Sequence, residues 1–331
     1  MDKDTLTKER YTTVFNEPPP LAPDAFEGGN EEPLRVLALT FGEPDQGSSY
    51  YRIYEFIEPL RAHGITLTAC PAKRFTQWGE LSAYDAVIIQ KRLFPVGRIR
   101  RIRRRARRLI YDIDDAIWHP HGKSAHFWYT NWRTRLRLKT TVARADLCLA
   151  ANPLLARHLA QWSAKVAVHP MALSETQWRP RVPPADSKPL RIGWAGSPVN
   201  LFYLEALEPA LAEVQREHPE VEFAVFCGRC PGFRELKFDY IPYQAGAEPD
   251  VIRRFDLGLL PLEACAFAEG KSPIKALQYM ACGLPTVVSP VGATRQLFRA
   301  GETGLFASTL LEWTQALRLL RVMILDVPGH Q

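Results

Sequence analysis

The segment from Leu34 to Ser49 reads LRVLALTFGEPDQGSS, and it indicates the fold class. Its first seven residues are an apolar run of strand length, and the loop that follows contains two glycines before a helical pattern begins. The segment from Leu190 to Leu201, LRIGWAGSPVNL, has the same order. A strand, a glycine-containing turn and a helix open an alternating α/β domain, so the sequence predicts two such domains.

The same alternation continues outward from both segments. Strands alternating with helices imply parallel sheets with right-handed crossovers, so we predict two Rossmann-like, doubly wound parallel-sheet domains that face each other across a cleft. The expected strands are 34–40, 65–71, 84–90, 109–113, 146–150 and 166–169, then 190–195, 221–226, 238–241, 256–260 and 285–288. A helical period predicts one helix over 49–63, although Pro59 lies inside it.

Proline-rich stretches and length set the domain organisation. The chain has 331 residues, which suits two domains. Residues 1–33 lack an apolar period and are expected to form a flexible leader, and prolines after Arg179 mark a linker over 174–189. The domains are then expected at 34–173 and 190–331. No apolar stretch approaches the ~20 residues of a membrane span, and the charged N-terminus is unlike a signal peptide, so a cytoplasmic location is expected.

The positive charge is concentrated in one segment. The net charge is +6, and ten basic residues with no acidic one lie between Lys91 and Leu109. Ile99, Ile102 and Ala106 recur at helical spacing, so we expect them to dock on the sheet while arginines face outward. The cationic surface is expected to consist of Arg98, Arg101, Arg104, Arg105 and Arg108. An anionic membrane surface or a lipid-phosphate acceptor would fit this cationic surface. The alternative that the arginines are simply a solvated face of the helix also stays open. Nucleic acid is disfavoured as a partner, because no aromatic residue lies between the arginines to stack on bases.

Cysteine and histidine patterns do not favour a metal site. Cys227 and Cys230 form one Cys-x-x-Cys, but structural zinc needs four ligands and no second close pair exists. His119, His121 and His126 lie in an expected loop without a cysteine or acid at ligand spacing. We expect reduced thiols, no metal and no tightly bound cofactor.

The tract from Glu269 to Pro285, EGKSPIKALQYMACGLP, predicts an anion-binding helix start. Pro273 suits the first turn, and Gly283 suits the end. Lys271, Ser272 and Lys275 therefore gather at a helix N-terminus, where ammonium groups and free amides can neutralise a diphosphate. The expected buried stripe is Ile274, Leu277 and Ala281, and Gln278 is expected one turn beyond Lys275 on the same face.

Two more helix starts and one acidic run complete the candidate site. Gly47–Ser48 and Gly196–Ser197 each precede a helix, where unpaired amides attract anions, although a serine cap would satisfy the first without a ligand. The run YDIDD, residues 111–115, puts three carboxylates at the carboxyl end of a strand. Asp114 or Asp115 is expected to orient an acceptor or sugar. Two alternatives stay open: an Asp-x-Asp metal site from Asp112 and Asp114, and helix capping by Asp115.

The tract from Gly270 to Ala293 resembles the donor-binding segment of retaining GT-B glycosyltransferases of the family 4 type. The run from Val166 to Pro180 is similar to the passage between the two domains in that family, and the run from Gly193 to Ser197 resembles its first C-terminal strand and loop. The match extends from about Leu34 to Ala307. The resemblance implies a nucleoside diphosphate sugar as donor, a hydroxyl acceptor that is lipid-linked or a polysaccharide, and retaining transfer without metal.

The resemblance also assigns roles to residues. It implies these donor-binding residues: Gly47, Ser48, Gly196, Ser197, Glu269, Lys271, Ser272, Pro273, Ile274, Lys275 and Gln278. The family usually has two glutamates separated by seven residues, of which the second binds the ribose. Those positions are Gly270 and Gln278 here, and Glu269 lies one residue out of register. Gln278 can still hydrogen-bond a ribose hydroxyl, without the strength of a carboxylate.

The leading expectation is therefore a glycosyltransferase. Its rivals are a metal-dependent Asp-x-Asp glycosyltransferase, an epimerase acting on the same donors, and a non-catalytic module that docks on a polyanion or membrane through the arginines.

Overall fold

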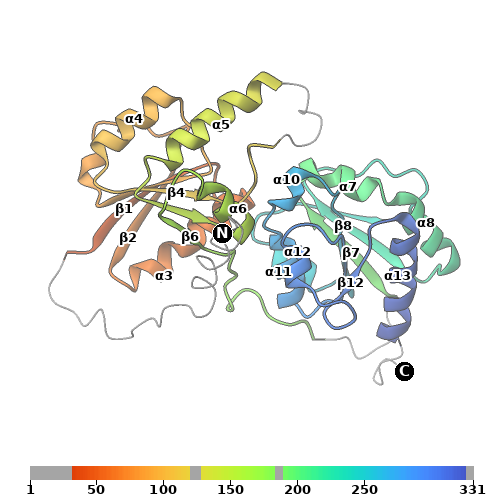
Figure 1. The fold of residues 1–331 in the computed structure, drawn as a ribbon. Helices are drawn as coiled ribbons and strands as arrows, with labels where there is room; N and C mark the ends of the chain where they lie inside the picture. The colour runs from red at the N-terminus through yellow and green to blue at the C-terminus, as the bar shows by residue number, and fades with distance from the viewer. Residues whose placement is uncertain (1–31, 120–127, 183–188, 326–331) are drawn as a thin grey trace.

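The computed structural model describes residues 32–119, 128–182 and 189–325, and Figure 1 shows two α/β units in this part of the chain. Most of the predicted leader, part of the predicted linker, and His121 and His126 lie outside the described residues. None of the described helices is long and apolar enough to cross a bilayer.

The first unit is a six-stranded parallel sheet with strand order β2-β1-β3-β4-β5-β6. Its strands are β1 Leu34–Thr40, β2 Ile65–Pro71, β3 Ala86–Gln90, β4 Leu109–Ile113, β5 Leu147–Ala150 and β6 Val166–Val168. Its helices are α2 Gly47–Arg52, η1 Tyr54–Phe56, α3 Ile57–Arg61, η2 Leu81–Ala83, α4 Val96–Arg105, α5 Trp128–Val142 and α6 Pro153–Leu159. The buried faces of the strands and of α4 to α6 share one apolar core.

The second unit is also six-stranded and parallel, with strand order β12-β11-β10-β7-β8-β9. Its strands are β7 Arg191–Gly196, β8 Glu222–Cys227, β9 Asp239–Pro242, β10 Leu257–Leu260, β11 Thr286–Val288 and β12 Leu305–Phe306. Its helices are η4 Pro198–Asn200, α7 Leu201–Glu205, α8 Glu208–Glu217, α9 Glu248–Ile252, α10 Ala266–Glu269, α11 Ile274–Ala281, α12 Thr294–Leu297 and α13 Leu310–Leu325. The predicted fold class is confirmed, and only the two-residue β12 had no sequence prediction.

The single helix predicted over 49–63 is wrong. The chain forms α2, η1 and α3 instead, and Ile53 interrupts the helical geometry with φ −133° and ψ −59°. The break places Pro59 in the first turn of α3, where its missing N–H costs no helical hydrogen bond. An uninterrupted helix would have held this proline in its interior.

The predicted buried stripe of α11 is also wrong. Ile274, Leu277 and Ala281 are half-buried, whereas Ala276 and Tyr279 are fully buried. The reason lies in the neighbouring strand, because a Cβ at Gly258 of β10 would lie 2.7 Å from the Tyr279 ring. The missing side chain therefore makes room for the ring, whose hydroxyl accepts a hydrogen bond from the Ala195 amide at 2.9 Å.

A buried ion pair joins α2 to the end of β4. Arg52 and Asp112 form two side-chain hydrogen bonds, one of 3.1 Å from Nε to Oδ2, and both side chains are almost fully buried. The same guanidinium donates to the carbonyl oxygens of His169 at 2.5 Å and Pro170 at 3.3 Å. One side chain thus fixes α2, β4 and the segment that leaves the first sheet.

We expect Arg52→Met to lower the free energy of unfolding by roughly 3–5 kcal/mol, because it leaves the Asp112 carboxylate buried without its partner. Urea unfolding followed by far-UV circular dichroism measures this loss. The control is Arg299→Met, whose ion pair with Glu302 is exposed and should contribute about 1 kcal/mol or less. The double variant R52M/D112L should be more stable than R52M, since no unpaired charge remains. Equal transition midpoints for R52M and R299M would contradict this role.

Candidate active site in the interdomain cleft

A cavity of about 600 Å³ lies where the carboxyl ends of the two sheets face each other. Loops beyond the strand ends are the usual ligand site of parallel α/β sheets. The cavity brings these predicted residues together: Gly47, Ser48, Asp114, Asp115, Gly196, Ser197, Lys271, Ser272, Pro273, Ile274 and Lys275. The binding and catalytic roles of these residues stay predictions. The residues come from loops of both sheets, and the fold brings them to one cavity.

Two lysines supply positive charge on the second-domain side. Burial lowers the pKa of Lys271, and burial lowers the pKa of Lys275 to about 8 although nearby Glu248 opposes this. The Lys271 ammonium donates to Asn200 Oδ1 at 2.8 Å. A lowered pKa means that the charged form lacks full compensation in the free protein. An anion entering the cavity would supply that compensation.

The backbone at the start of α11 offers fewer donors than its sequence indicates. Pro273 has no N–H, and the Ile274 amide donates to the Ser272 carbonyl at 2.9 Å. The Ser272 hydroxyl already lies 3.2 Å from the Asn152 amide. The lysine ammonium groups therefore carry the larger share of any attraction for a phosphate.

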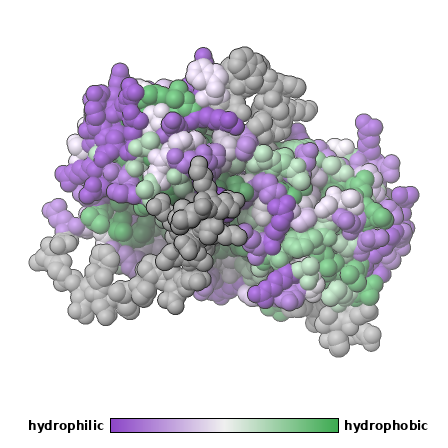
Figure 2. Space-filling view, in the orientation of Figure 1, coloured by the Kyte–Doolittle hydropathy of each residue, from purple (hydrophilic) through white to green (hydrophobic). Residues whose placement is uncertain are grey.

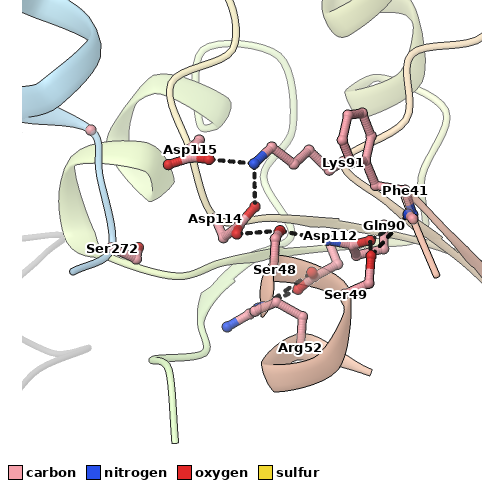
Figure 3. A network of polar contacts seen from close by, with 12 residues as sticks. Phe41, Ser48, Ser49, Arg52, Gln90, Lys91, Asp112, Asp114, Asp115 and Ser272 are labelled. Atoms are coloured by element: carbon pink, nitrogen blue, oxygen red, sulfur yellow. Dashed lines mark hydrogen bonds and ion pairs between the residues drawn. The ribbon is translucent and has the colours of Figure 1, made fainter. Parts of the chain in front are cut away.

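A network of polar contacts occupies the first-domain side (Figure 3). Ser48 Oγ donates to Asp114 Oδ2 at 2.5 Å, and Lys91 Nζ forms ion pairs with Asp114, at 3.3 Å, and with Asp115. Ser48 therefore bonds a carboxylate instead of capping its own helix, and Asp115 pairs with a lysine. Burial alone would lower the pKa of Lys91, but the two carboxylates outweigh it and raise that pKa above its ordinary value. The lysine stays charged and holds both aspartates in place.

The Asp-x-Asp sequence does not form a paired metal-binding site. The carboxylate of Asp112 is buried against Arg52, whereas Asp114 bonds Ser48 and Lys91. A divalent cation needs several free oxygen ligands, and these two carboxylates are each held by a cation of the protein. Among the described residues, no cluster of three histidines, cysteines or acids could hold a metal ion. The side chains of Asp112 and Asp114 therefore do not fit the Asp-x-Asp metal site considered from the sequence.

Contacts between the domains explain the glycine at position 270. A Cβ there would lie 2.4 Å from the Ala116 Cβ, so no larger residue fits without separating the two domains. The buried side-chain amide of Asn152 donates to the Gly270 carbonyl at 3.1 Å. In this arrangement the position that the resemblance associates with a sugar-binding glutamate forms a backbone contact with the first domain.

Two predicted donor-binding residues lie outside the cavity lining. Gln278 is fully buried, and its Nε2 donates to the Tyr51 hydroxyl at 2.7 Å. Gln278 lies one turn beyond Lys275 on α11, and its partner Tyr51 lines the cavity, so Gln278 contacts the cavity only through Tyr51. Glu269 binds Arg295 through both carboxylate oxygens, at 2.8 and 2.9 Å. Neither side chain is directed at the space that a donor would fill.

Sequence reasoning missed two charged groups in the site. Lys91 was counted with the surface arginines, yet it directly follows β3 and has a φ of 58°, which is uncommon for a side-chain-bearing residue. Its position directly after a predicted strand could have indicated that Lys91 lies near the ligand-binding end of the sheet. Glu248 lines the cavity and accepts hydrogen bonds from the Tyr243 hydroxyl at 3.1 Å and the Gly246 amide at 2.9 Å. Nothing in the local sequence marks Glu248.

The arginine run is less uniform than predicted. Ile99, Ile102 and Ala106 are buried as expected. However, two arginines of the run form ion pairs with acids outside it, Arg103 with Asp146 at 3.2 Å and Arg107 with Asp85 at 3.1 Å. Both acids lie just before other strands of the sheet, so their proximity could not be seen locally.

Of the residues considered for a metal site, Cys227, Cys230 and His119 lie in the described part of the chain. Cys227 is buried in β8 and Cys230 is exposed, and all six cysteines are free. Burial lowers the pKa of His119, whose ring lies 5.9 Å from that of Trp118.

Comparison with known proteins agrees with this geometry. Residues 192–321 match the family model described as glycosyl transferases group 1. No curated protein sequence matches the chain. Among solved structures, Anabaena HepE in complex with UDP and glucose is similar, with 16% identity, a TM-score of 0.60 and coverage of 89% of this chain and 91% of that chain. Sucrose-phosphate synthase from Thermosynechococcus elongatus has 14% identity, a TM-score of 0.62 and coverage of 87% and 89%.

Two facing Rossmann-like domains with a cleft at their strand ends are the arrangement of the GT-B fold, which the chain shares with these solved structures. Within the second domain, residues 192–321 are similar to the glycosyl transferases of group 1.

The pKa of Lys275 predicts a pH dependence for anion binding. Below about pH 8 the ammonium is charged and attracts a diphosphate, and above that pH the free protein loses this charge. We expect the affinity for a nucleoside diphosphate to be nearly constant between about pH 7, where the phosphate is fully ionised, and about pH 8, and to fall by up to about tenfold per pH unit above that. Isothermal titration calorimetry at several pH values measures the slope. Lys275→Arg is the control, because arginine stays charged and should flatten the profile. A wild-type profile that is also flat would contradict this assignment.

Proposed function

We propose that the protein is a metal-independent, retaining glycosyltransferase that moves a sugar from a nucleoside diphosphate sugar to a hydroxyl acceptor. The observation that carries the proposal is the pair of half-buried lysines, Lys271 and Lys275, which line the interdomain cavity together with the Gly196–Ser197 loop. Their charge matches the diphosphate of such a donor. HepE, a structural neighbour of the same fold, was crystallised with UDP-glucose.

Charge stabilisation of the leaving group supplies the main catalytic effect in this proposal. Negative charge grows on the diphosphate as the glycosidic bond breaks, and ammonium groups fixed in a site with little water stabilise that charge strongly. Lys271 and Lys275 are already desolvated before the donor binds, so little reorganisation is needed. The bound diphosphate would raise the pKa of both lysines and keep them charged.

The aspartates of the first domain act on the other substrate. Asp115 lines the cavity and is held there by Lys91, which places its carboxylate where the hydroxyl of an acceptor can donate a hydrogen bond to it. Asp114 is fixed more tightly, by Ser48 and Lys91, and positions that pair. The two domains already touch at Gly270 and Gln278, and this contact limits the access of water to the donor. The retaining outcome follows the resemblance to family 4 enzymes.

We expect Lys275→Ala to lower kcat/KM on the order of 10²–10³-fold without unfolding the protein, since it removes one charge from the leaving-group site. A thermal-shift screen of UDP, GDP, TDP, ADP and CDP first identifies the nucleotide, because a ligand that binds the native state raises Tm. Release of that nucleoside diphosphate from its sugar donors then measures turnover.

The matched control is Lys237→Ala, an exposed lysine of the second domain outside the cavity lining. Its turnover should equal that of the unmodified protein. Unchanged turnover in the Lys275→Ala variant, at the same Tm, would remove the phosphate-binding role.

Chelation distinguishes this proposal from the metal-dependent alternative. The Asp112 carboxylate is held by Arg52, so we expect turnover to be the same with EDTA as with added manganese. Donor turnover under both conditions measures this. Activity that EDTA abolishes and manganese restores would favour the Asp-x-Asp enzyme.

A further inference from the structure

The outer helices of the first domain, α4 and α5, pack against each other and contain no acidic residue. Their sequences are VGRIRRIRRR and WYTNWRTRLRLKTTV. Figure 1 shows both helices on one side of the first sheet, and Figure 2 shows hydrophilic residues gathered on this part of the surface. The positive field of this face is therefore not neutralised by acids on its own helices.

Most of the outward arginines have no ion-pair partner in the described part of the chain. Arg103 and Arg107 pair with acids at the sheet edge, whereas Arg100, Arg101 and Arg104 are exposed and form no such pair among the described residues. Like charges at this density repel one another, so an external anion would stabilise the face.

Exposed apolar groups lie among these charges. Trp132 and Leu136 are 51% and 46% exposed, and they lie one turn apart on α5. Lys139 is exposed one further turn along the same face, while Leu138 and Val142 are buried in the core. A helix that turns a tryptophan and a leucine outward between basic residues is typical of a surface that rests on a lipid interface, where the ring sits among the headgroups.

A small hollow beside α4 adds phosphate-binding chemistry. Its volume is about 160 Å³, and Arg98, Arg101 and Arg105 line it together with Trp78. The Arg98 guanidinium lies 5.2 Å from the centre of the Trp78 ring, which holds the side chain in place. Guanidinium groups bind phosphate through paired hydrogen bonds, so the hollow fits a lipid headgroup phosphate.

We propose that the α4–α5 face docks the protein on an anionic phospholipid bilayer. Nucleic acid fits less well, because α4 has no aromatic ring for base stacking, and the exposed Trp132 of α5 lies beside the exposed Leu136, an apolar pair that suits a lipid interface. Docking holds the first domain, which carries Asp114 and Asp115, next to the membrane, where a lipid-linked hydroxyl would be presented. The proposal does not depend on the glycosyltransferase function, since docking needs no donor.

Vesicle sedimentation with the full chain tests this docking. We expect binding to vesicles of phosphatidylcholine mixed with phosphatidylglycerol, and little binding to phosphatidylcholine alone. Each basic residue near an anionic surface contributes a factor of about five, so the variant R100Q/R101Q/R104Q should bind on the order of a hundredfold more weakly. Added salt should weaken the binding of the unmodified protein.

The matched control changes three basic residues of the second domain, as R234Q/K237Q/R254Q. These side chains are exposed and form no ion pair among the described residues, so the net charge changes equally. The control should keep its vesicle binding. Both triple variants should keep the Tm shift with a nucleoside diphosphate, which shows an intact fold and separates this test from that of the proposed function.

A third variant isolates the apolar contact. Trp132→Ser should weaken vesicle binding several-fold while leaving its salt dependence unchanged, because it removes an inserted ring and no charge. Equal losses in the two triple variants would overturn the proposal, and so would equal binding to neutral and anionic vesicles. Binding to single-stranded poly(U) that is tighter than vesicle binding, and that R100Q/R101Q/R104Q abolishes, would also overturn it and assign the face to nucleic acid.

Discussion

The buried ion pair between Arg52 and Asp112 ties three separate parts of the chain together. Arg52 belongs to α2, Asp112 lies one residue before the end of β4, and N–H groups of the guanidinium bind the carbonyl oxygens of His169 and Pro170. Two charges taken out of water are stable only with such complete pairing. The pair therefore fixes where α2 crosses the sheet and where the chain leaves the first domain, and both decide the shape of the cleft.

The ion pair between Arg52 and Asp112 also separates the aspartates of the run 111–115 into one buried carboxylate and two that line the cavity. Ser48 and Arg52 lie one turn apart on α2, and they bind Asp114 and Asp112, which lie two residues apart along the chain. The Asp112 carboxylate is buried in its ion pair with Arg52. Asp114 and Asp115 line the cavity and are held there by Lys91. A sequence that resembles a metal site thus becomes one structural carboxylate and two cleft carboxylates (Figure 3).

The two departures from the glycosyltransferase pattern both lie at the contact between the domains. Gly270 permits the close approach of Ala116, and Gln278 donates to Tyr51 across the cleft. A glutamate at position 270 would clash here, and a carboxylate at position 278 would be buried beside the Tyr51 hydroxyl. Both substitutions are therefore compatible with closely packed domains, in which the lysines of the second domain face the aspartates of the first.

Local sequence patterns were enough to predict the two parallel α/β sheets and part of the cavity lining. Strand periodicity and glycine turns are local, and the ligand loops of parallel sheets lie at the strand ends, so Lys271, Lys275, Asp114 and Asp115 could be predicted to converge. The partner of each charged or polar side chain depends instead on the tertiary structure. Lys91, counted among the surface cations, faces two aspartates, and Gln278 donates to Tyr51 of the first domain, because each contact joins elements far apart in the chain.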